Sequence, residues 1–339
     1  MLPDEERRLR ERQKSPQQLR AAHGDQARVS VIVPSYNHAP FVKTTLRSIF
    51  NQTLAPAELL VIDDGSADDS PRIIERILTD CPFPCELVAR TNRGLCATLN
   101  EGLAKTRGRY FAYLGSDDLW LPGFLEARIS MLETTPQAVL AYGNCFFIDA
   151  QNLIIDCTHD WANYTNGNAR EMLLQQTFAP MSPTVTYRRA NLERNGWDEQ
   201  VRLEDYDLYL RLSLEGDFAF DSRVLSAWRQ HAYNTSRDFS WIIDARLAAQ
   251  QRLAARIGLS ATELEHFQRV SKFAGAEDLL RLGEKAKAVK LLRQSFGGAQ
   301  STAALLRVLA RLCAPYSLMK WRRKRRQTRA AQRYGPLIV

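Results

Sequence analysis

The sequence lacks the features that mark membrane-spanning, disulfide-stabilised and zinc-binding proteins. Its six cysteines, in a chain of 339 residues, include no CxxC pair, so their spacing predicts reduced thiols rather than a zinc site or a disulfide framework. No apolar run approaches the roughly 20 residues that are needed to cross a bilayer. The first residues, Met1 to Glu6, contain no hydrophobic core of the signal-peptide kind. These absences predict a globular protein of the cytoplasm.

Acidic residues are missing from one stretch near the carboxyl end, and the charge of the chain is therefore uneven. Residues 320–333 contain eight Lys and Arg residues but no Asp or Glu, and they account for the whole net charge of +8. The preceding residues, 302–312, show an amphipathic helical pattern, and Trp321 adjoins the basic run. Residues 302–333 therefore match a segment that lies on the anionic inner face of the plasma membrane. A solvated basic tail is the alternative, and nucleic acid is disfavoured because no interleaved aromatic face accompanies the charge.

Short apolar runs alternate with helical patterns through the first third of the chain. The expected strands are residues 29–33, 59–62, 86–89 and 109–114, and the expected helices are residues 40–51, 68–80 and 95–106. This alternation predicts an α/β fold with a mostly parallel sheet and flanking helices. The next part is expected to form helices at 122–134 and 203–216 and strands at 138–148, 183–188, 218–220 and 224–228. A separate helical segment follows, with helices at 242–257, 261–273, 276–282, 285–295 and 302–312.

A polar cluster follows each of the first four predicted strands. The clusters are Ser35-Tyr36-Asn37, Asp63-Asp64, Asn92-Arg93-Gly94 and Ser116-Asp117-Asp118. Parallel strands meet at their carboxyl ends along one edge of a sheet, and nucleotides bind in the crevice at that edge. Adjacent carboxylates such as Asp117 and Asp118 repel each other unless a cation or hydrogen-bond donors hold them. The pair therefore indicates a divalent metal site, with a helix-capping turn as the alternative.

From Val29 to about Ser236 the sequence resembles the family 2 glycosyltransferases of the GT-A fold. The matching stretches are, in order, Val31 to Asn37, Glu58 to Ser66, Asn92 to Gly94 with Asn100 and Gly102, Ser116 to Asp118, Glu204-Asp205, and Arg229 to His231 with Asn234. The resemblance implies a Rossmann-like GT-A domain at residues 28–238, with a nucleotide-binding half (28–120) and an acceptor half (121–238). Residues 1–27 would form a charged extension, and residues 239–339 a helical region with the basic tail.

The resemblance also implies the roles of the site residues. Asp205 would be the catalytic base that takes the proton of the acceptor hydroxyl in an inverting transfer. Asp118 and His231 would bind Mn²⁺ or Mg²⁺, which would bridge the diphosphate of the donor. Tyr36 would stack on the nucleobase, and Asp64 would accept the ring N–H of a uracil or thymine. The other implied substrate-binding residues are Pro34, Asn37, Asp63, Asn92, Arg93, Gly94, Asn100, Asp117, Trp197 and Glu204.

Several of these residues have a structural alternative: Tyr36 as a half-buried loop aromatic, Asp63-Asp64 as part of an ordinary tight turn, and Glu204-Asp205 as charge at a helix N-terminus. Trp197 could equally pack in the core, His231 could bond to backbone, and Arg93 could be a solvated surface residue.

The sequence therefore predicts an inverting, metal-dependent glycosyltransferase that uses a UDP- or dTDP-sugar. The expected acceptor is a cell-surface glycan, either free or lipid-linked. A sugar-phosphate nucleotidyltransferase is disfavoured because the loop from Pro34 to His38 contains no glycine to wrap a phosphate. A silent nucleotide-sugar-binding or nucleic-acid-binding protein is disfavoured because the carboxylates at positions 64, 117, 118 and 205 are all present.

Overall fold

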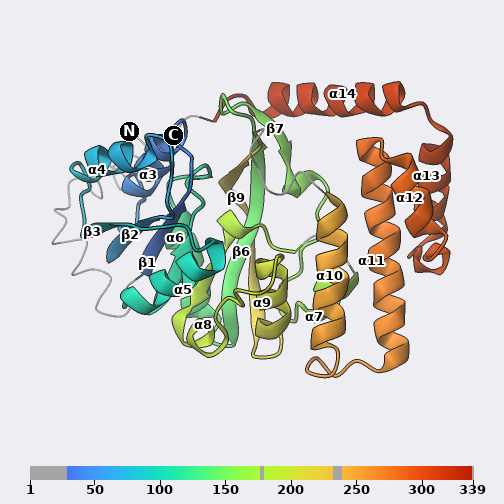
Figure 1. The fold of residues 1–339 in the computed structure, drawn as a ribbon, viewed down its shortest axis with the longest axis horizontal. Coiled ribbons are helices and arrows are strands. Elements are labelled where there is room, and N and C mark those ends of the chain that lie inside the picture. Colours follow the sequence, from blue (N-terminus) through green and yellow to red (C-terminus); the bar gives the residue numbers. More distant parts are fainter. Residues whose placement is uncertain (1–28, 176–178, 232–238, 338–339) are drawn as a thin grey trace, which may run out of the picture.

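The alternating pattern of the first third of the chain folds into parallel strands joined by helices (Figure 1). The computed structural model describes residues 29–175, 179–231 and 239–337, so the predicted extension at 1–27 and Asn234 lie outside the described residues. The strands are β1 (Val29–Ser35), β2 (Glu58–Asp63), β3 (Cys85–Ala89) and β4 (Tyr110–Tyr113), in the spatial order β3-β2-β1-β4. The helices between them are α3 (Val42–Phe50), α4 (Ser70–Leu78) and α5 (Leu95–Lys105).

Beyond β4 the sheet becomes mixed, which the prediction of a mostly parallel sheet did not anticipate. The order continues through β8 (Thr186–Arg188), β6 (Ala138–Ile148), β9 (Asp217–Arg229) and β5 (Leu119–Trp120), and β7 (Ile154–Cys157) pairs with β6. Only β6 and β9 pair in parallel in this half. The two short strands expected at 218–220 and 224–228 are one strand, β9, which shifts its register against β6 near Gly143 and Asn144 and then continues.

Both faces of the sheet are covered, so the middle residues of β1 and β2 are apolar on both faces. Successive residues of β1 point to opposite faces. Val31 and Val33 pack with α3, α4 and α6 (Phe124–Thr134), whereas Ile32 packs on the other side. That other side also holds α7 (Arg170–Gln175), α8 (Arg189–Asn195) and α9 (Glu204–Leu212). The short 3₁₀ helices η1 (Thr158–Asp160) and η2 (Ser182–Thr184) complete this part of the fold.

The carboxyl-terminal region is helical, as predicted, and the α/β class is confirmed. It contains α10 (Phe239–Leu253), α11 (Ala261–Leu282), α12 (Lys285–Leu292), the 3₁₀ helix η4 (Phe296–Gly298), α13 (Thr302–Cys313) and α14 (Tyr316–Tyr334). The two helices expected at 261–273 and 276–282 are one helix, α11, that continues through Gly275. A Cβ at Gly275 would lie 2.6 Å from Cδ1 of Ile243, so this glycine allows α10 and α11 to approach closely and does not end the helix.

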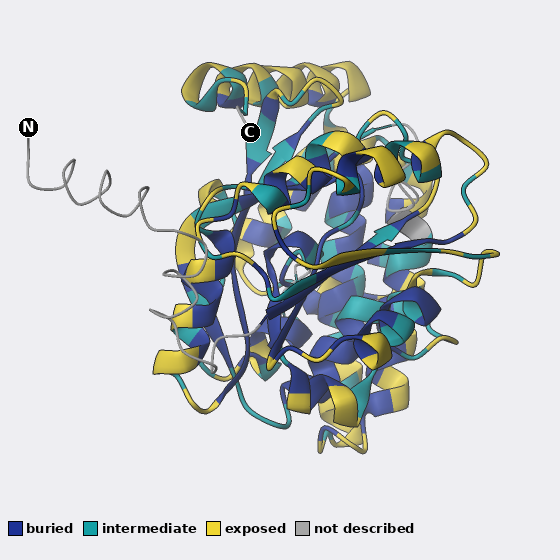
Figure 2. Cartoon of the chain, turned by 90° about the vertical axis from the view of Figure 1, so that its left-hand side faces the viewer, coloured by how far each residue is buried: buried dark blue, intermediate teal, exposed yellow. Residues whose placement is uncertain are grey.

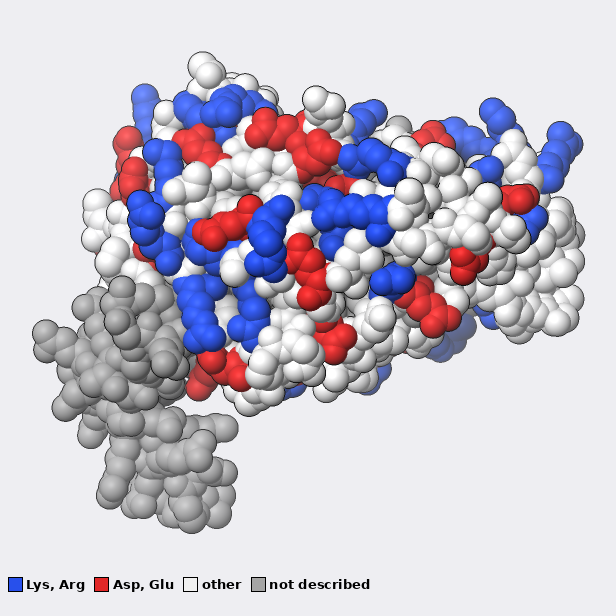
Figure 3. All heavy atoms as spheres, turned by 90° about the horizontal axis from the view of Figure 1, so that it is seen from below, with Lys and Arg blue, Asp and Glu red and all other residues white. Residues whose placement is uncertain are grey.

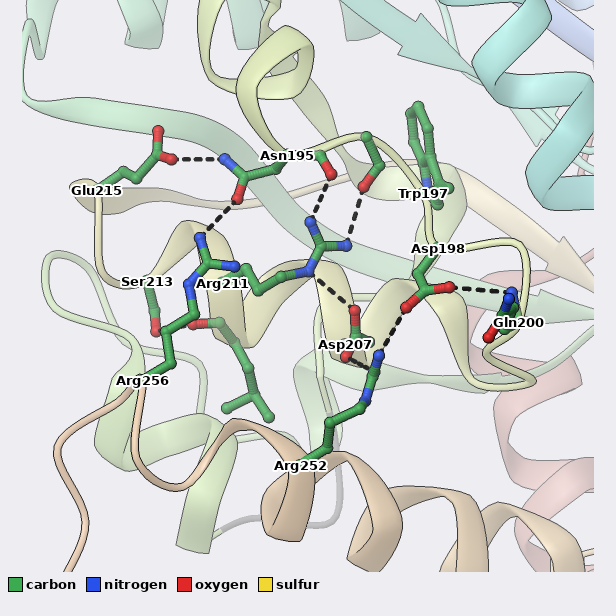
Figure 4. A network of polar contacts seen from close by, with 12 residues as sticks. Asn195, Trp197, Asp198, Gln200, Asp207, Arg211, Ser213, Glu215, Arg252 and Arg256 are labelled. Carbon is green, nitrogen blue, oxygen red and sulfur yellow. Dashed lines mark hydrogen bonds and ion pairs between the residues drawn. The ribbon is translucent and has the colours of Figure 1, made fainter.

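Helix α10 packs directly against the α/β part of the chain. Ala249, Leu253 and Ile257 belong to the same apolar cluster as α9. Arg252 of α10 forms ion pairs with Asp198 and with the buried carboxylate of Asp207 on α9 (Figure 4). The predicted domain boundary at residue 238 stays a prediction, but the core does not end there.

The basic tail forms a 19-residue helix, α14, which lies along one edge of the molecule (Figure 1) and exposes most of its residues (Figure 2). In the parts of the chain that the structure describes, no helix is both long and apolar enough to span a membrane.

We expect Gly143→Ala to destabilise the fold strongly. Arg128 is fully buried and pairs with Asp221 at 2.8 Å. A Cβ at position 143 would meet the Arg128 guanidinium and lie 2.7 Å from the carbonyl oxygen of Asp221. Breaking such a buried pair costs about 3 kcal/mol, to be measured by urea unfolding. Gly297→Ala is the control, because nothing lies within 4 Å of its Cβ position; equal stability of the two variants would contradict the prediction.

Candidate active site

The Asp117-Asp118 pair lies on a tight turn directly after β4. The amide of Asp118 donates to the carbonyl of Gly115 at 3.0 Å, which closes the turn. The hydroxyl of Thr45, on α3, lies 2.9 Å from the carbonyl oxygens of both Ser116 and Asp118. Helix α3 therefore fixes the backbone of the turn, and the two carboxylates leave it in different surroundings.

The carboxylate of Asp118 points into the protein. It is 4% exposed, and its Oδ1 accepts a hydrogen bond of 2.8 Å from the amide of Arg229 at the end of β9. The buried guanidinium of Arg229 donates at 2.7 Å to the carbonyl oxygen of Asp117. Burial, and then the charge of Asp117, raise the pKa of Asp118 well above its usual range, while Arg229 opposes the rise. The role of Asp118 as a direct metal ligand remains a prediction. The geometry favours the carboxylate of Asp117 as a metal ligand instead.

Asp117 faces two imidazoles. Its Oδ2 lies 2.9 Å from Nε2 of His231, and its Oδ1 lies 3.7 Å from Nδ1 of His38. Ligand atoms of the three side chains all lie within 4.8 Å of one another, the only such group among the described residues. Burial alone would raise the pKa of Asp117, but the hydrogen bond with His231 and the charge of His38 outweigh it, so this pKa is lowered. Burial lowers the pKa of His38, against the attraction of Asp117.

His38 was not predicted as a site residue. Its contact with Asp117 depends on how the loop after β1 approaches the loop after β4, and Nδ1 of His38 is fixed 2.8 Å from the Ser116 hydroxyl. The only signal in the sequence was its place four residues after Pro34, at the end of the first polar cluster. Two nitrogen donors beside one carboxylate suit Mn²⁺ better than Mg²⁺, which prefers oxygen ligands.

The loop after β2 is held by its two aspartates. Asp63 is buried and accepts hydrogen bonds from the backbone amide (2.9 Å) and the hydroxyl (2.6 Å) of Ser66. Asp64 accepts 2.8 Å hydrogen bonds from the amides of Arg93 and Gly94 and pairs with the guanidinium of Arg90. Asp63 thus supports its own loop, and Asp64 joins the loops after β2 and β3.

The loop after β1 is tied to the same place. The amide of Asn37 donates to the Ser66 hydroxyl, and its side-chain oxygen accepts from the amide of Ala67, each at 2.8 Å. Asn37 has a φ of 55°, a left-handed conformation that asparagine tolerates better than most residues. The neighbouring Tyr36 is 50% exposed, so its ring is free of the core.

Other predicted donor-site residues lie around these loops. Pro34 is near the end of β1, beyond Ile32, which is the last residue of β1 paired with β4. The N–H that proline lacks is therefore not needed for the hydrogen bonds between β1 and β4. Asn92 is exposed. Arg93 is mostly exposed and lies 3.5 Å from Glu101.

Asp205 and Glu204 begin helix α9, and Asp205 is linked to the strand that leads into the Asp117 turn. The hydroxyl of Tyr113, the last residue of β4, lies 2.8 and 3.0 Å from the two carboxylate oxygens of Asp205. Burial raises the pKa of Asp205 to about 6, although Tyr113 favours the charged form. Burial and the charge of Asp205 raise the pKa of Glu204 to about 8.

Trp197 lies in the core, as its alternative interpretation held. It is 3% exposed, and its ring packs edge-to-face against the rings of Tyr113 and Tyr187. Asn100 clamps its backbone: the side-chain amide donates to the Trp197 carbonyl at 2.8 Å, and the side-chain oxygen accepts from the Trp197 amide at 2.9 Å. Trp197 therefore supports Tyr113 by packing, and Asn100 fixes the backbone of Trp197. The predicted contact of both residues with substrate stays a prediction.

A network of charges supports this region from behind (Figure 4). Arg211 donates to the carbonyls of Asn195 and Gly196 at 2.7 and 2.9 Å and pairs with Asp207 at 2.9 Å. The turn that carries Trp197 and the helix that carries Asp205 are thereby locked together.

Residues 30–196 match the model of glycosyl transferase family 2. Among curated proteins, chondroitin synthase of Escherichia coli is 28% identical over 209 residues, which are 61% of this chain and 30% of that protein. Hyaluronan synthase of Pasteurella multocida is 25% identical over 209 residues, 61% of this chain and 21% of that protein. The chain spans 30%, 52% and 65% of the length of three of the curated relatives that it matches.

Solved structures with the same fold cover nearly the whole chain. S. aureus TarS in complex with UDP-GlcNAc matches with a TM-score of 0.57 and 15% identity, over 92% of this chain and 93% of that one. Mannosyltransferase PcManGT of Pyrobaculum calidifontis, in complex with GDP-Man and Mn²⁺, matches with a TM-score of 0.55 and 20% identity, over 96% and 92%. The fold is therefore that of a nucleotide-sugar transferase of the GT-A type. The chain belongs to the family 2 glycosyltransferases.

We expect Glu204→Gln to stabilise the protein at pH 8. A carboxyl group whose pKa rises to about 8 on folding binds a proton more tightly when folded, so its charge penalises the folded state as the pH rises above 4.5. Removing that charge should add about 4 kcal/mol at pH 8, and the gain should vanish as the pH falls toward 4.5. Thermal melting across this pH range measures it. The exposed Glu75→Gln is the control, and a gain independent of pH would rule out the explanation.

Proposed function

We propose that the protein transfers a sugar from a nucleotide-diphospho-sugar to a glycan hydroxyl, with inversion at the anomeric carbon and assistance from a divalent metal. One observation carries the proposal: Tyr113 joins Asp205 to the strand whose next turn presents Asp117 to His38 and His231. A candidate proton acceptor and a candidate metal site therefore lie at the end of a single strand. Family membership, with the loops after β1, β2 and β3 meeting at the same edge, supports a nucleotide beside them.

The donor would bind across the loops after β1 and β2. The half-exposed ring of Tyr36 offers a stacking surface for the nucleobase. Asp64 already accepts hydrogen bonds from three groups of the chain, and a carboxylate offers about four acceptor sites, so one is left for the ring N–H of a uracil or thymine. UDP-GlcNAc in TarS and GDP-Man in PcManGT are the donors of two proteins with this fold. We infer a UDP- or dTDP-sugar for this chain.

The residues His38, Asp117 and His231 fit a divalent cation, and we infer that they hold Mn²⁺. The lowered pKa of Asp117 keeps its carboxylate charged and ready to bind a cation. When bound, the metal would neutralise the negative charge that develops on the departing nucleoside diphosphate. The buried guanidinium of Arg229 donates a hydrogen bond to the backbone carbonyl of Asp117. The side-chain carboxylate of Asp117 is thereby directed toward the two imidazoles.

Asp205 would act as the general base. A group with a pKa of about 6 is mostly ionised at neutral pH and still basic enough to accept the proton of an attacking hydroxyl. Tyr113 orients both carboxylate oxygens, and burial, together with the charge of Asp205, raises the pKa of the neighbouring Glu204 to about 8. The synthases of chondroitin and hyaluronan among the relatives support a polysaccharide as acceptor.

We expect Asp117→Asn to abolish Mn²⁺ binding in isothermal titration calorimetry, with His38→Ala weakening it. Loss of the charged oxygen, or of one nitrogen donor, removes a ligand from the group of three. Asp118→Asn tests the competing assignment. If Asp118→Asn removes the binding while Asp117→Asn retains it, Asp118 is the ligand and the geometric assignment is wrong. Asp69→Asn, at an exposed carboxylate, is the control.

We expect Asp205→Asn to lower kcat by a factor of about 10² to 10⁴ and to leave the KM for the donor unchanged. The donor is chosen from a panel of nucleotide-sugars by thermal shift with Mn²⁺, since a ligand of the native state raises the melting temperature. Metal-dependent turnover that survives Asp205→Asn unchanged would refute the proposal.

Tyr113→Phe removes the hydroxyl that bonds both oxygens of the Asp205 carboxylate. The pKa of Asp205 should therefore rise, and the acidic limb of the pH–rate profile should move to higher pH.

A further inference from the structure

Helix α14 lies on the body of the protein by one narrow face. Met319 and Ala330 are its buried residues, and their spacing of three helical turns places them on the same side. Two ion pairs hold the helix in this orientation: Arg326 with Asp156 at 2.6 Å and Arg333 with Asp160 at 3.0 Å. Two of the eight basic residues of the tail therefore form ion pairs with the body of the protein, and these pairs fix which side of the helix faces outward.

The opposite face is basic and carries an exposed aromatic ring. Trp321, Lys324, Arg325, Thr328, Arg329 and Gln332 line a shallow groove along it, and we call these six residues the outer face of α14. Trp321 is 54% exposed, with the guanidinium of Arg325 5.2 Å from its ring centroid. Leu318, one turn before, is 41% exposed. The side of the molecule seen in Figure 3, away from α14, differs because its basic side chains lie among acidic ones.

We propose that the outer face of α14 binds the surface of a membrane rich in anionic phospholipids. The three basic side chains of this face match the phosphates of such lipids, and a Trp beside them suits the headgroup layer, where its ring is partly desolvated. The helix is too polar to enter the hydrocarbon, so the contact is superficial. Nucleic acid fits less well, because one ring on the face cannot provide a series of stacked bases.

The apolar contribution of α13 is smaller than the sequence predicted. Leu305 and Leu312 pack in the core of the carboxyl-terminal helices, and only Leu306 and Leu309 are exposed. Of the segment at 302–333 that the sequence assigned to the membrane, the proposal therefore keeps only the part in α14.

The residues that follow α14 are hydrogen-bonded to a turn that is also linked, through Arg229, to the candidate metal site. The amide of Leu337 donates to the carbonyl of Asn152 at 2.9 Å, in the turn between β6 and β7. In the same turn the carbonyl of Asp149 accepts a 2.9 Å hydrogen bond from Arg229, which also bonds the Asp117 turn. A membrane bound to α14 would therefore be held at a fixed position relative to the Asp117 turn, as a lipid-linked acceptor would require if the proposed function is correct.

Co-sedimentation with vesicles tests the proposal on the full chain, without donor or acceptor, so its outcome is independent of catalysis. Wild-type protein should bind vesicles that contain phosphatidylglycerol and should not bind vesicles of phosphatidylcholine alone. The triple variant Lys324→Gln, Arg325→Gln, Arg329→Gln should bind about a hundredfold more weakly, as expected for the loss of three charges near an anionic surface. Trp321→Ala should weaken binding in high salt, where the attraction between charges is screened.

The matched control is Lys287→Gln, Lys290→Gln, Arg293→Gln, which removes the same charge from exposed positions on α12 and just after it. Circular dichroism and melting temperature check that each variant is folded. Equal loss of binding in both triple variants would mean that net charge alone attracts the vesicles, and the proposal would fail. It would also fail if vesicle binding were unchanged in the α14 variant while binding to a DNA oligonucleotide was lost.

Discussion

Arg229 brings a positive charge into the interior beside two neighbouring carboxylates, and the arrangement of the candidate metal site depends on it. Its amide bonds the Asp118 carboxylate, and its guanidinium bonds the backbone of Asp117 and of Asp149. Strand β9 is paired with β6 up to this residue, so the sheet itself fixes where the charge lies. His231, two residues later, reaches Asp117 for the same reason. The turn that carries Asp117 is thus held by the end of a strand and not only by neighbouring loops.

The two acidic residues at the start of α9 are arranged at a cost to stability. Glu204 and Asp205 lie side by side in partly buried positions, and both pKa values are raised, which means that their charged forms are disfavoured by the fold. The surrounding structure compensates for this. Asp207 is paired with two arginines, Arg211 and Arg252, and the helix that carries all three acids is packed on both sides. Functional groups with perturbed pKa values are commonly supported in this way.

The sequence allowed the strand-end loops to be predicted because hydrophobic periodicity is local and the edge of a parallel sheet gathers the loops that follow its strands. The sequence assigned the metal to Asp118, but it could not show the surroundings of the two carboxylates, since these depend on Arg229, which is more than a hundred residues away. His38 was missed for a similar reason, because its partners come from other loops. Helix α11 was divided at Gly275 because a glycine that permits close packing looks, in a sequence, like one that ends a helix.

The family model ends at residue 196, before Asp205 and before the arginine of α10 that pairs with Asp207. The stretch that the family model matches is therefore smaller than the stretch that must fold together. The Asp117 turn lies within the matched part, whereas the candidate base Asp205 lies on a helix that the family model does not include. Because α9 and α10 share one apolar cluster and the pair of Arg252 with Asp207, a fragment cut at residue 196 would lack part of its own core. A shortened or chimeric form of this chain would have to keep α10 in order to keep that core.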